Sequence, residues 1–196
     1  MSDPTIVISA SPHIHSDRTS KKLMYDVLIA LIPAFLVSLY LFGISALVLT
    51  SVAVASCLLF EYLIQKYLLK TEVTTSDGSA LLTGILLAFN LPASLPIWMV
   101  VVGSLVAIGV AKLSFGGLGN NIFNPALVGR VFLLVSFPVQ MTTWPIPVEN
   151  MTTLVDATTG ATTLGIIKEE LMYGSTMSVI SSKIPSTADL LLGISG

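Results

Sequence analysis

A polar loop near the C-terminal end of the chain carries the residues best suited to covalent chemistry. Residues 156–162 read Asp-Ala-Thr-Thr-Gly-Ala-Thr and follow five hydrophobic stretches. The hydroxyl of Thr162 can attack a phosphoryl group, and the small Gly160 and Ala161 beside it let the active site of a second enzyme close over the backbone. A threonine-rich surface loop is the alternative interpretation, because Asp and Gly are ordinary turn residues. Thr162 is therefore a candidate site of modification, with Thr158, Thr159 and Thr163 in the same stretch.

A second polar interruption, residues 115–125, contains three glycines and three asparagines. Asparagine side chains beside a glycine-rich backbone can hydrogen-bond a planar polar ligand, and the glycines allow that ligand to approach closely. Asn121 and Asn124 are the candidate ligand-binding residues here. A plain cytoplasmic turn fits the same composition equally well.

Composition sets the class of protein that must position these loops. Of the 196 residues, 54% are hydrophobic and only 10% are charged, and the mean hydropathy is +0.89. So few charged residues cannot cover the surface of a soluble globule of that length, so we predict an integral membrane protein. Nucleic acid is not an expected partner. The single cysteine, Cys57, excludes a disulfide framework or a four-thiolate iron–sulfur site within this chain alone.

Apolar segments predict an all-α, polytopic membrane fold with about five spans. We expect Gly43 to form a tight hairpin between the first two segments. The third has 13 residues before Pro92 and covers about 20 Å of a bilayer core roughly 30 Å thick, which predicts a short or broken helix buried against protein or lining a cavity. An ordinary short span behind a surface turn fits the spacing equally. The segments are residues 23–42, 44–64, 79–91, 96–113 and 125–141.

Basic residues set the predicted orientation. With a cytoplasmic N-terminus, the seven Lys and Arg residues between positions 18 and 130 all fall on the cytoplasmic side, as the positive-inside rule prefers. We therefore predict a cytoplasmic tail over residues 1–22, membrane helices over 23–142, an extracytoplasmic loop over 143–189 and the start of a further membrane segment over 190–196. Arg130 lies one turn into the fifth segment. Two interpretations remain open for it: a buried arginine with a function, or an arginine that snorkels to the membrane interface.

Four blocks of sequence occur together, residues 11–14, 76–84, 121–127 and the loop that ends in 162–164. In combination they resemble the NqrB/RnfD family of membrane subunits, which includes the RnfD subunit of the Rnf electron-transport complex and the NqrB subunit of the sodium-pumping NADH:quinone oxidoreductase. The short tail ahead of the first segment favours the Rnf type. Family members continue into further helices that mirror the first set, so the resemblance implies one half of an inverted-repeat architecture and a truncated chain.

The resemblance implies a covalent flavin on the outer face of the membrane. FMN would be joined to Thr162 by a phosphoester bond, and a flavin transferase would recognise the motif formed with Asp156, Thr159, Gly160 and Ala161. Thr159 stands where serine is common in this motif, which should leave attachment intact. A second flavin, such as riboflavin, is implied at the asparagine-containing loop described above.

The resemblance also implies a subunit of an ion-translocating oxidoreductase that is not catalytic alone. Complexes of this family pass electrons from reduced ferredoxin to NAD+ and export Na+ or H+ across the bacterial inner membrane, so other membrane and peripheral subunits are the expected partners. Asp26, Glu61 and Asp77 are then candidate residues of the ion path. Asp26 lies four residues after Lys22, so an interfacial ion pair is the alternative for that residue.

Two other classes of protein remain open at this stage. Short helices, glycine-rich interruptions and asparagines in the membrane also describe a channel or secondary transporter for a small polar solute. A purely structural scaffold for partner subunits is the third possibility. Covalent flavin separates them, because neither a solute channel nor a scaffold needs a transferase-recognised threonine.

Overall fold

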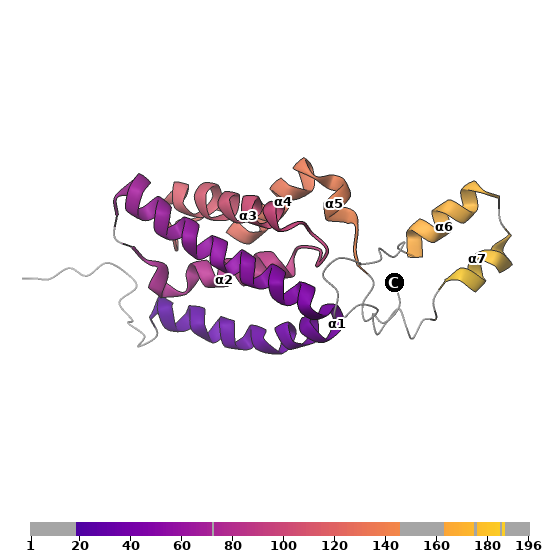
Figure 1. Cartoon of the computed structure of the whole chain (residues 1–196), viewed down its shortest axis with the longest axis horizontal. Helices are drawn as coiled ribbons and strands as arrows, with labels where there is room; N and C mark the ends of the chain where they lie inside the picture. Colours follow the sequence, from indigo (N-terminus) through magenta and orange to yellow (C-terminus); the bar gives the residue numbers. More distant parts are fainter. Residues whose placement is uncertain (1–18, 72, 146–162, 175, 185, 187–196) are drawn as a thin grey trace, which may run out of the picture.

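The computed structural model describes residues 19–71, 73–145, 163–174, 176–184 and 186, and these residues fold into helices joined by turns and loops (Figure 1). This agrees with the all-α class expected from the sequence. The helices from α1 to α5 form one bundle, and α6 and α7 stand beyond one of its ends (Figure 1).

Helix α1 (Ser20–Leu63) is a hairpin of two arms. Gly43 interrupts its helical backbone with φ 57° and ψ −139°, a conformation that favours glycine because a Cβ would be strained there. Figure 1 shows the chain reversing direction near the α1 label. The second arm continues as the π-helix η1 (Ile64–Leu69), which ends at Lys70 in the left-handed region. The predicted hairpin at Gly43 is confirmed.

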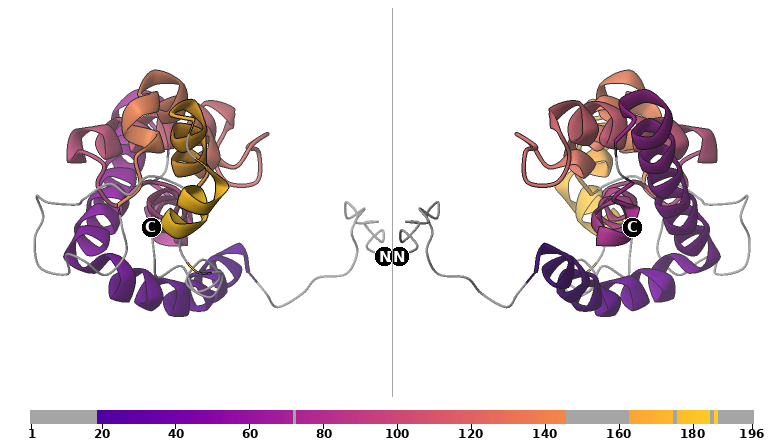
Figure 2. Two further views of the ribbon diagram at one scale, coloured as in Figure 1. Left: turned by 90° about the vertical axis from the view of Figure 1, so that its right-hand side faces the viewer. Right: turned by 90° about the vertical axis from the view of Figure 1, so that its left-hand side faces the viewer.

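Helix α2 (Ser79–Phe89) follows the short 3₁₀ helix η2 (Thr75–Asp77) and packs mainly against α1. Gly84 permits this contact, because a Cβ added there would lie 2.7 Å from Cα of Val54 in the second arm. The end-on views in Figure 2 show α2 near the centre of the bundle. At 1.5 Å per residue its 11 residues reach only about 17 Å, so the third apolar segment is the short helix that its sequence predicts.

The fourth segment is continuous and the fifth is not. Helix α3 (Ile97–Leu105), the π-helix η3 (Val106–Lys112) and the 3₁₀ helix η4 (Leu113–Phe115) run on as one apolar stretch of 19 residues. Helix α4 (Pro125–Ser136) then stops at Phe137, whose φ of −134° and ψ of 61° are not helical, and α5 (Pro138–Thr142) begins anew.

This break corrects the expectation of one span over residues 125–141. Pro138 restricts the backbone of the residue before it and has no N–H to continue the helix, so α4 is limited to 12 residues. The bundle therefore contains two short apolar helices, α2 and α4, where the sequence indicated one. These two helices contact each other.

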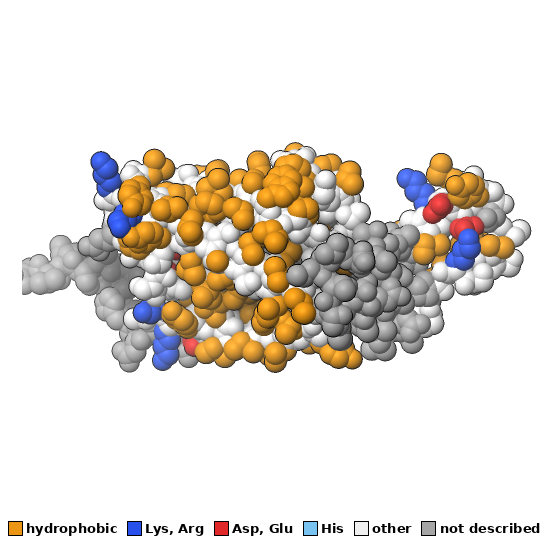
Figure 3. Space-filling view, in the orientation of Figure 1, with side chains coloured by type: hydrophobic (Ala, Val, Ile, Leu, Met, Phe, Trp, Pro, Cys, Tyr) orange, Lys and Arg blue, Asp and Glu red, His pale blue; other side chains and the backbone are white. Residues whose placement is uncertain are grey.

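Within the described part of the chain, the stretches Ser20–Leu69 and Ile97–Phe115 are long and apolar enough to cross a membrane. Because Gly43 divides the first stretch, its arms reach roughly 34 and 39 Å, and each can cross a bilayer core of about 30 Å. The described residues thus contain three long and two short apolar segments, where the sequence indicated four long segments and one short one. Figure 3 shows hydrophobic side chains over the bundle, with its exposed basic side chains gathered at the end where α1 begins.

Helices α6 (Thr163–Met172) and α7 (Met177–Lys183) pack against each other. Lys183 of α7 donates a hydrogen bond to Glu170 Oε1 of α6. Several large apolar side chains of this pair are exposed, including Leu164 and Met172.

Candidate functional site

A buried ion pair joins the second arm of α1 to the end of η3. The Nζ of Lys112 lies 2.5 Å from Oε1 of Glu61, and the two side chains are 2% and 0% exposed. These residues are 51 positions apart in the sequence. A lysine and a glutamate are almost never fully buried unless they are paired, so each side chain requires the other.

The ion pair extends through Ser79 to Asp77. Lys112 Nζ donates to Ser79 Oγ at 2.6 Å, and Ser79 Oγ in turn donates to Asp77 Oδ1 at 2.6 Å. The same carboxylate oxygen accepts from the backbone N–H of Ser79 at 2.8 Å, so Asp77 also caps the start of α2. We call Glu61, Lys112, Ser79 and Asp77 the buried charge cluster. It brings together two of the three acids that the sequence suggested for the ion path.

The charge cluster is not balanced. It holds two carboxyl groups and one ammonium group, and Oε2 of Glu61 is buried without a hydrogen-bond partner. When all three groups are ionised, the cluster carries one negative charge in excess. A buried charge without compensation is costly, which makes this position suited to receiving one further cation.

Asp26 does not join the cluster. Its side chain is exposed on the first arm of α1, and the ion pairs among the described residues are Lys112 with Glu61 and Lys183 with Glu170. The pair between Lys22 and Asp26, expected as the alternative for Asp26, is therefore absent.

A pocket of about 350 Å³ adjoins the charge cluster. Lys112, Ser79 and Thr83 contribute to one part of its wall, and Asn121 and Asn124 to another. Oδ1 of Asn121 is buried without a hydrogen-bond partner. We call this the asparagine pocket. Its apolar lining comes from Met24, Leu82, Leu86, Leu118, Ile122, Phe123 and Pro125.

The two asparagines have different roles in the structure. Oδ1 of Asn124 accepts a hydrogen bond from the backbone N–H of Ala126 at 3.0 Å and so forms the N-cap of α4, followed by Pro125 at the first helical position. That oxygen is committed to the helix. Asn121 Oδ1 is the acceptor that a ligand in the pocket could satisfy.

The asparagine pocket fits the general properties of a flavin site. It is mostly apolar, opens broadly at the surface and lies within the usual size of small-molecule sites, about 300–1,000 Å³, and a few polar side chains line it. An unpartnered acceptor and an ammonium group suit the ring edge of a flavin, which presents both N–H and carbonyl groups. The motif for covalent FMN, residues 156–162, lies outside the described residues.

Arg130 connects the two short helices. Its Nη1 donates to Oδ1 of Asn90, at the end of α2, with a distance of 2.9 Å. Asn90 Nδ2 donates to the carbonyl of Leu86 within α2. Arg130 therefore turns toward a neighbouring helix and is partly buried, and this contact holds α4 against α2.

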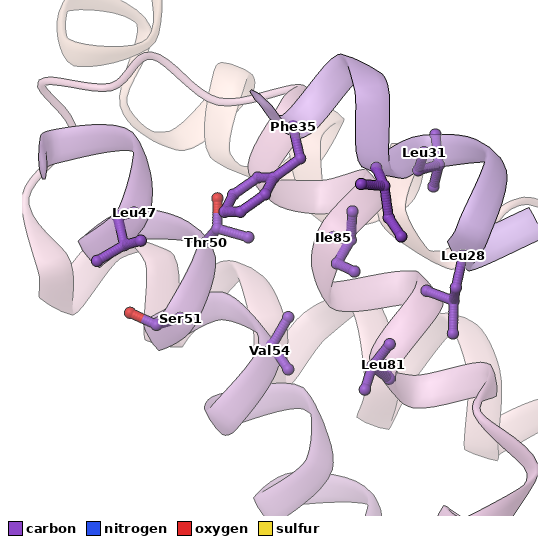
Figure 4. A pocket seen from close by; sticks show the side chains of 10 residues that line it. Leu28, Leu31, Phe35, Leu47, Thr50, Ser51, Val54, Leu81 and Ile85 are labelled. Carbon is purple, nitrogen blue, oxygen red and sulfur yellow. The ribbon is translucent and has the colours of Figure 1, made fainter. Parts of the chain in front are cut away.

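A separate pocket of about 270 Å³ lies between the two arms of α1 and the helix α2 (Figure 4). Leu31 and Phe35 come from the first arm, and Thr50 and Ser51 from the second. Both hydroxyls donate to carbonyls of their own helix, at 2.7 and 2.9 Å, so neither has a donor left for a ligand. This apolar pocket has no group for chemistry, in contrast to the asparagine pocket.

Sequence reasoning missed Lys112 as a site residue. It assigned this lysine to the cytoplasmic end of the fourth segment as a topology signal, but the side chain is buried. The available signal was a single charge that directly ends the apolar run of residues 97–111. The partner, Glu61, could not be identified from spacing.

Comparisons with known proteins agree with the resemblance found in the sequence. The sequence signature of the NQR2, RnfD, RnfE family matches residues 7–196. The D subunit of the Na+-translocating ferredoxin:NAD+ oxidoreductase complex of Acetobacterium woodii is 45% identical over 100% of this chain and 57% of its own length. The D subunit of the proton-translocating ferredoxin:NAD+ oxidoreductase complex of Clostridium ljungdahlii is 47% identical over 82% of this chain and 47% of its own length.

A third relative, the D subunit of an ion-translocating oxidoreductase complex of Escherichia coli, is 46% identical over 76% of this chain and 44% of its own length. The chain spans about half the length of these curated relatives. The match over nearly all residues, together with these identities, shows that the chain belongs to the NQR2, RnfD, RnfE family.

Proposed function

We propose that this chain is part of a D-type membrane subunit of a redox-driven ion pump, a ferredoxin:NAD+ oxidoreductase of the Rnf type. The observation that carries the proposal is the charge cluster buried inside an apolar helical bundle. Ionisable residues inside a membrane are costly and mark ion pathways more often than structural contacts. Relatives named as Na+-translocating and proton-translocating complexes provide the setting in which such a cluster is useful.

Glu61 and Asp77 are the proposed residues of the ion path. The excess negative charge and the unpartnered Oε2 of Glu61 support binding of one cation, either Na+ or H+. Asp77 is only partly buried, so it is suited to receive a cation from the membrane surface. Asp26 is exposed on the outside of the bundle and can serve only at the entrance of such a path.

Thr162 is the proposed attachment site of FMN. Its hydroxyl would form a phosphoester bond with the flavin phosphate, in the motif that includes Asp156, Thr159, Gly160 and Ala161. The bound flavin supplies one-electron and two-electron redox chemistry, and the protein fixes it near its redox partners and tunes its potential.

The asparagine pocket is the proposed site of a second, non-covalent flavin such as riboflavin. Asn121 would hydrogen-bond the ring edge through its free carbonyl oxygen, and Lys112 would place a positive charge beside the ligand. Asn124 would contribute mainly by holding the start of α4 in place. The apolar lining would exclude water from the ring.

The proposed orientation places the N-terminus in the cytoplasm of a bacterial inner membrane, with α6 and α7 outside. The gathering of exposed basic side chains at one end of the bundle supports it (Figure 3). A cysteine introduced at Ser178, an exposed residue of α7, in a Cys57→Ala background should react with an impermeant thiol reagent on intact cells. If labelling requires cell lysis, the orientation is the opposite of the proposed one.

Mass spectrometry tests the flavin proposal. The complete subunit, expressed with a flavin transferase, should yield a peptide of residues 156–168 that carries one FMN at Thr162, and Thr162→Ala should abolish the adduct. Thr163→Ala is the matched control, because it removes a neighbouring hydroxyl and should leave the adduct intact. A wild-type protein without covalent flavin would instead favour a solute permease or a scaffold.

A further inference from the structure

One cation, the ammonium group of Lys112, belongs to both the charge cluster and the asparagine pocket. It contacts Glu61 Oε1 at 2.5 Å and Ser79 Oγ at 2.6 Å, and its side chain also lines the pocket. Two of its three N–H donors are used in these contacts. Any change of charge in the pocket therefore acts directly on the partner of Glu61.

Lys112 and a transported cation would compete for the same carboxylate. Glu61 carries its one described hydrogen bond on Oε1, and its other oxygen is buried without a partner. A cation that entered beside Oε2 would lie a few ångströms from the ammonium group. Two like charges at about 4 Å repel by roughly 4 kcal/mol at an effective dielectric constant of 20, so both cannot remain against Glu61 without cost.

The side chain of Lys112 is flexible and lies beside both sites. Lys112 is the last residue of the π-helix η3, and π-helical turns are frequent at functional sites. Its buried side chain contacts Ser79 and also lines the asparagine pocket. A small rotation of its four-carbon stem can therefore move the charge toward the pocket while it stays near Ser79.

We propose that Lys112 is a tethered counter-cation that couples the charge of a ligand in the asparagine pocket to cation binding at Glu61. With a neutral ligand in the pocket, the ammonium group covers Glu61 and excludes the transported cation. With an anionic ligand, the ammonium group turns toward the pocket, and Glu61 becomes free to bind Na+ or H+. The proposal rests on the pocket ligand and the ion site of the proposed function, and it assigns to Lys112 the link between them.

Coupling of this kind is reciprocal. If a negative charge in the pocket raises the affinity of Glu61 for a cation, a cation at Glu61 must favour the negative charge in the pocket by the same factor. Typical coupling between two sites changes affinities about 5–150-fold. Lys112 is a positioning residue in this scheme, because it acts through Glu61 and the pocket ligand.

The test follows the carboxylate of Glu61 by infrared difference spectroscopy in the complete purified complex. The Glu61 band is assigned by its loss in Glu61→Gln. Its response is then measured as Na+ is added at fixed pH, and as the pH is changed at fixed Na+. Both titrations are carried out on the oxidised and on the reduced complex. In wild type, reduction should lower the half-saturating cation concentration at least fivefold. Lys112→Met removes the competitor, so the oxidised complex should bind the cation at least tenfold more tightly and lose its dependence on reduction.

Lys112→Arg provides a second, opposite prediction if Lys112→Met assembles poorly. The guanidinium group keeps the charge and can engage both oxygens of Glu61 at once, so cation affinity should fall below that of wild type. Lys66→Met, which removes an exposed lysine outside the cluster, should behave as wild type. If Lys112 had only a structural role, the cation would bind more weakly in Lys112→Met than in Lys112→Arg. That order of affinities would overturn the proposal.

Failure of the proposed function gives a different result. If the Glu61 band of the wild-type complex does not respond to cations, Glu61 is not an ion site. If denaturation releases no non-covalent flavin, the pocket does not hold the proposed ligand. Either result would also overturn the proposed role of Lys112. A wild-type band that responds to cation and to reduction, with an unaltered response in Lys112→Met, would overturn the role of Lys112 alone.

Discussion

Two lysine–glutamate pairs with the same chemistry lie in opposite surroundings in this protein. Lys112 and Glu61 are 2% and 0% exposed within the bundle. Lys183 and Glu170, which join α6 to α7, are 54% and 12% exposed. The first pair must overcome the loss of hydration of both charges, whereas in the second pair the lysine keeps much of its contact with water.

Stability alone explains the exposed pair but not the buried one. Hydrophobic residues of similar volume often replace a buried ion pair with equal or greater stability, so retention of charge inside an apolar bundle requires another reason. The proposed function supplies one, because the excess carboxylate of the cluster and the pocket beside Lys112 could bind an ion and a ligand. The comparison thus separates a structural contact from a functional one.

Removal of a single partner should have the largest effect on stability. Lys112→Ala leaves Glu61 buried and unpaired, so the free energy of unfolding in mixed micelles should fall by about 3–5 kcal/mol. Lys183→Ala, the matched change in the exposed pair, should give no measurable loss. Lys112→Met combined with Glu61→Gln should recover most of the stability, because both charges of the fully buried pair are then absent and Asp77 is only partly buried. Equal losses at positions 112 and 183 would remove the distinction between the two pairs.

Helix packing around the cluster should give the next largest effect. In Gly84→Ala the new Cβ would meet backbone atoms of Val54 at 2.7 Å, so the second arm of α1 must shift, and we expect a loss of about 1–3 kcal/mol. Gly109→Ala is the control, because its nearest contact is Cδ1 of Ile64 at 3.3 Å, the end of a side chain that is only partly buried. Thermal unfolding of the two variants should rank them in that order. A similar tolerance of both would mean that contact between α1 and α2 does not fix the cluster.

The two asparagines of the pocket should separate stability from ligand binding. Asn124→Ala removes the N-cap of α4 and should cost about 1 kcal/mol of unfolding free energy. Asn121→Ala removes an unpartnered buried oxygen, so stability should be unchanged while the content of non-covalent flavin falls. Unfolding curves and flavin released by acid denaturation measure the two effects. Flavin loss in Asn124→Ala alone would transfer the ligand role to that residue.

The smallest expected effect is the pH response of the exposed pair. The hydrogen bond to Glu170 raises the pKa of Lys183 above its ordinary value. The contribution of this pair is therefore fully present below the ordinary lysine pKa, near 10.4, and is lost only as pH rises through the raised pKa. Hydrogen exchange of α6 and α7, corrected for intrinsic rates, should be the same at pH 7 and pH 9. A loss of protection in that interval would show that other groups govern the contact.

Local features of the fold could be predicted from the sequence because their causes are local. Gly43 stands alone between two long apolar runs, and the run after Ser79 is too short before Pro92 to cross a bilayer. The end of α4 at Phe137 was equally local. The hydrophobic pattern continues to Met141 and conceals it, although Pro138 is a signal for the end of a helix.

The charge cluster could be predicted only in part, because its geometry depends on contacts between distant segments. Glu61 and Asp77 were recognisable as acids near apolar runs. Their connection through Lys112 depends on the packing of α1 against α2 and η3, which brings together residues 51 positions apart. Asn124 was predicted as a ligand residue, and its use as a helix cap follows from Pro125 and the start of α4.

Cation uptake by a matched pair of variants tests the central claim, that the buried cluster belongs to the ion path, most directly. The complete complex would be reconstituted in vesicles with Glu61→Gln or Glu170→Gln and supplied with reduced ferredoxin and NAD+, and uptake of Na+ and H+ would be followed. We predict that Glu61→Gln, once assembled with its flavins, loses at least tenfold in uptake, whereas Glu170→Gln remains close to wild type. Uptake at the wild-type rate in Glu61→Gln would contradict the account.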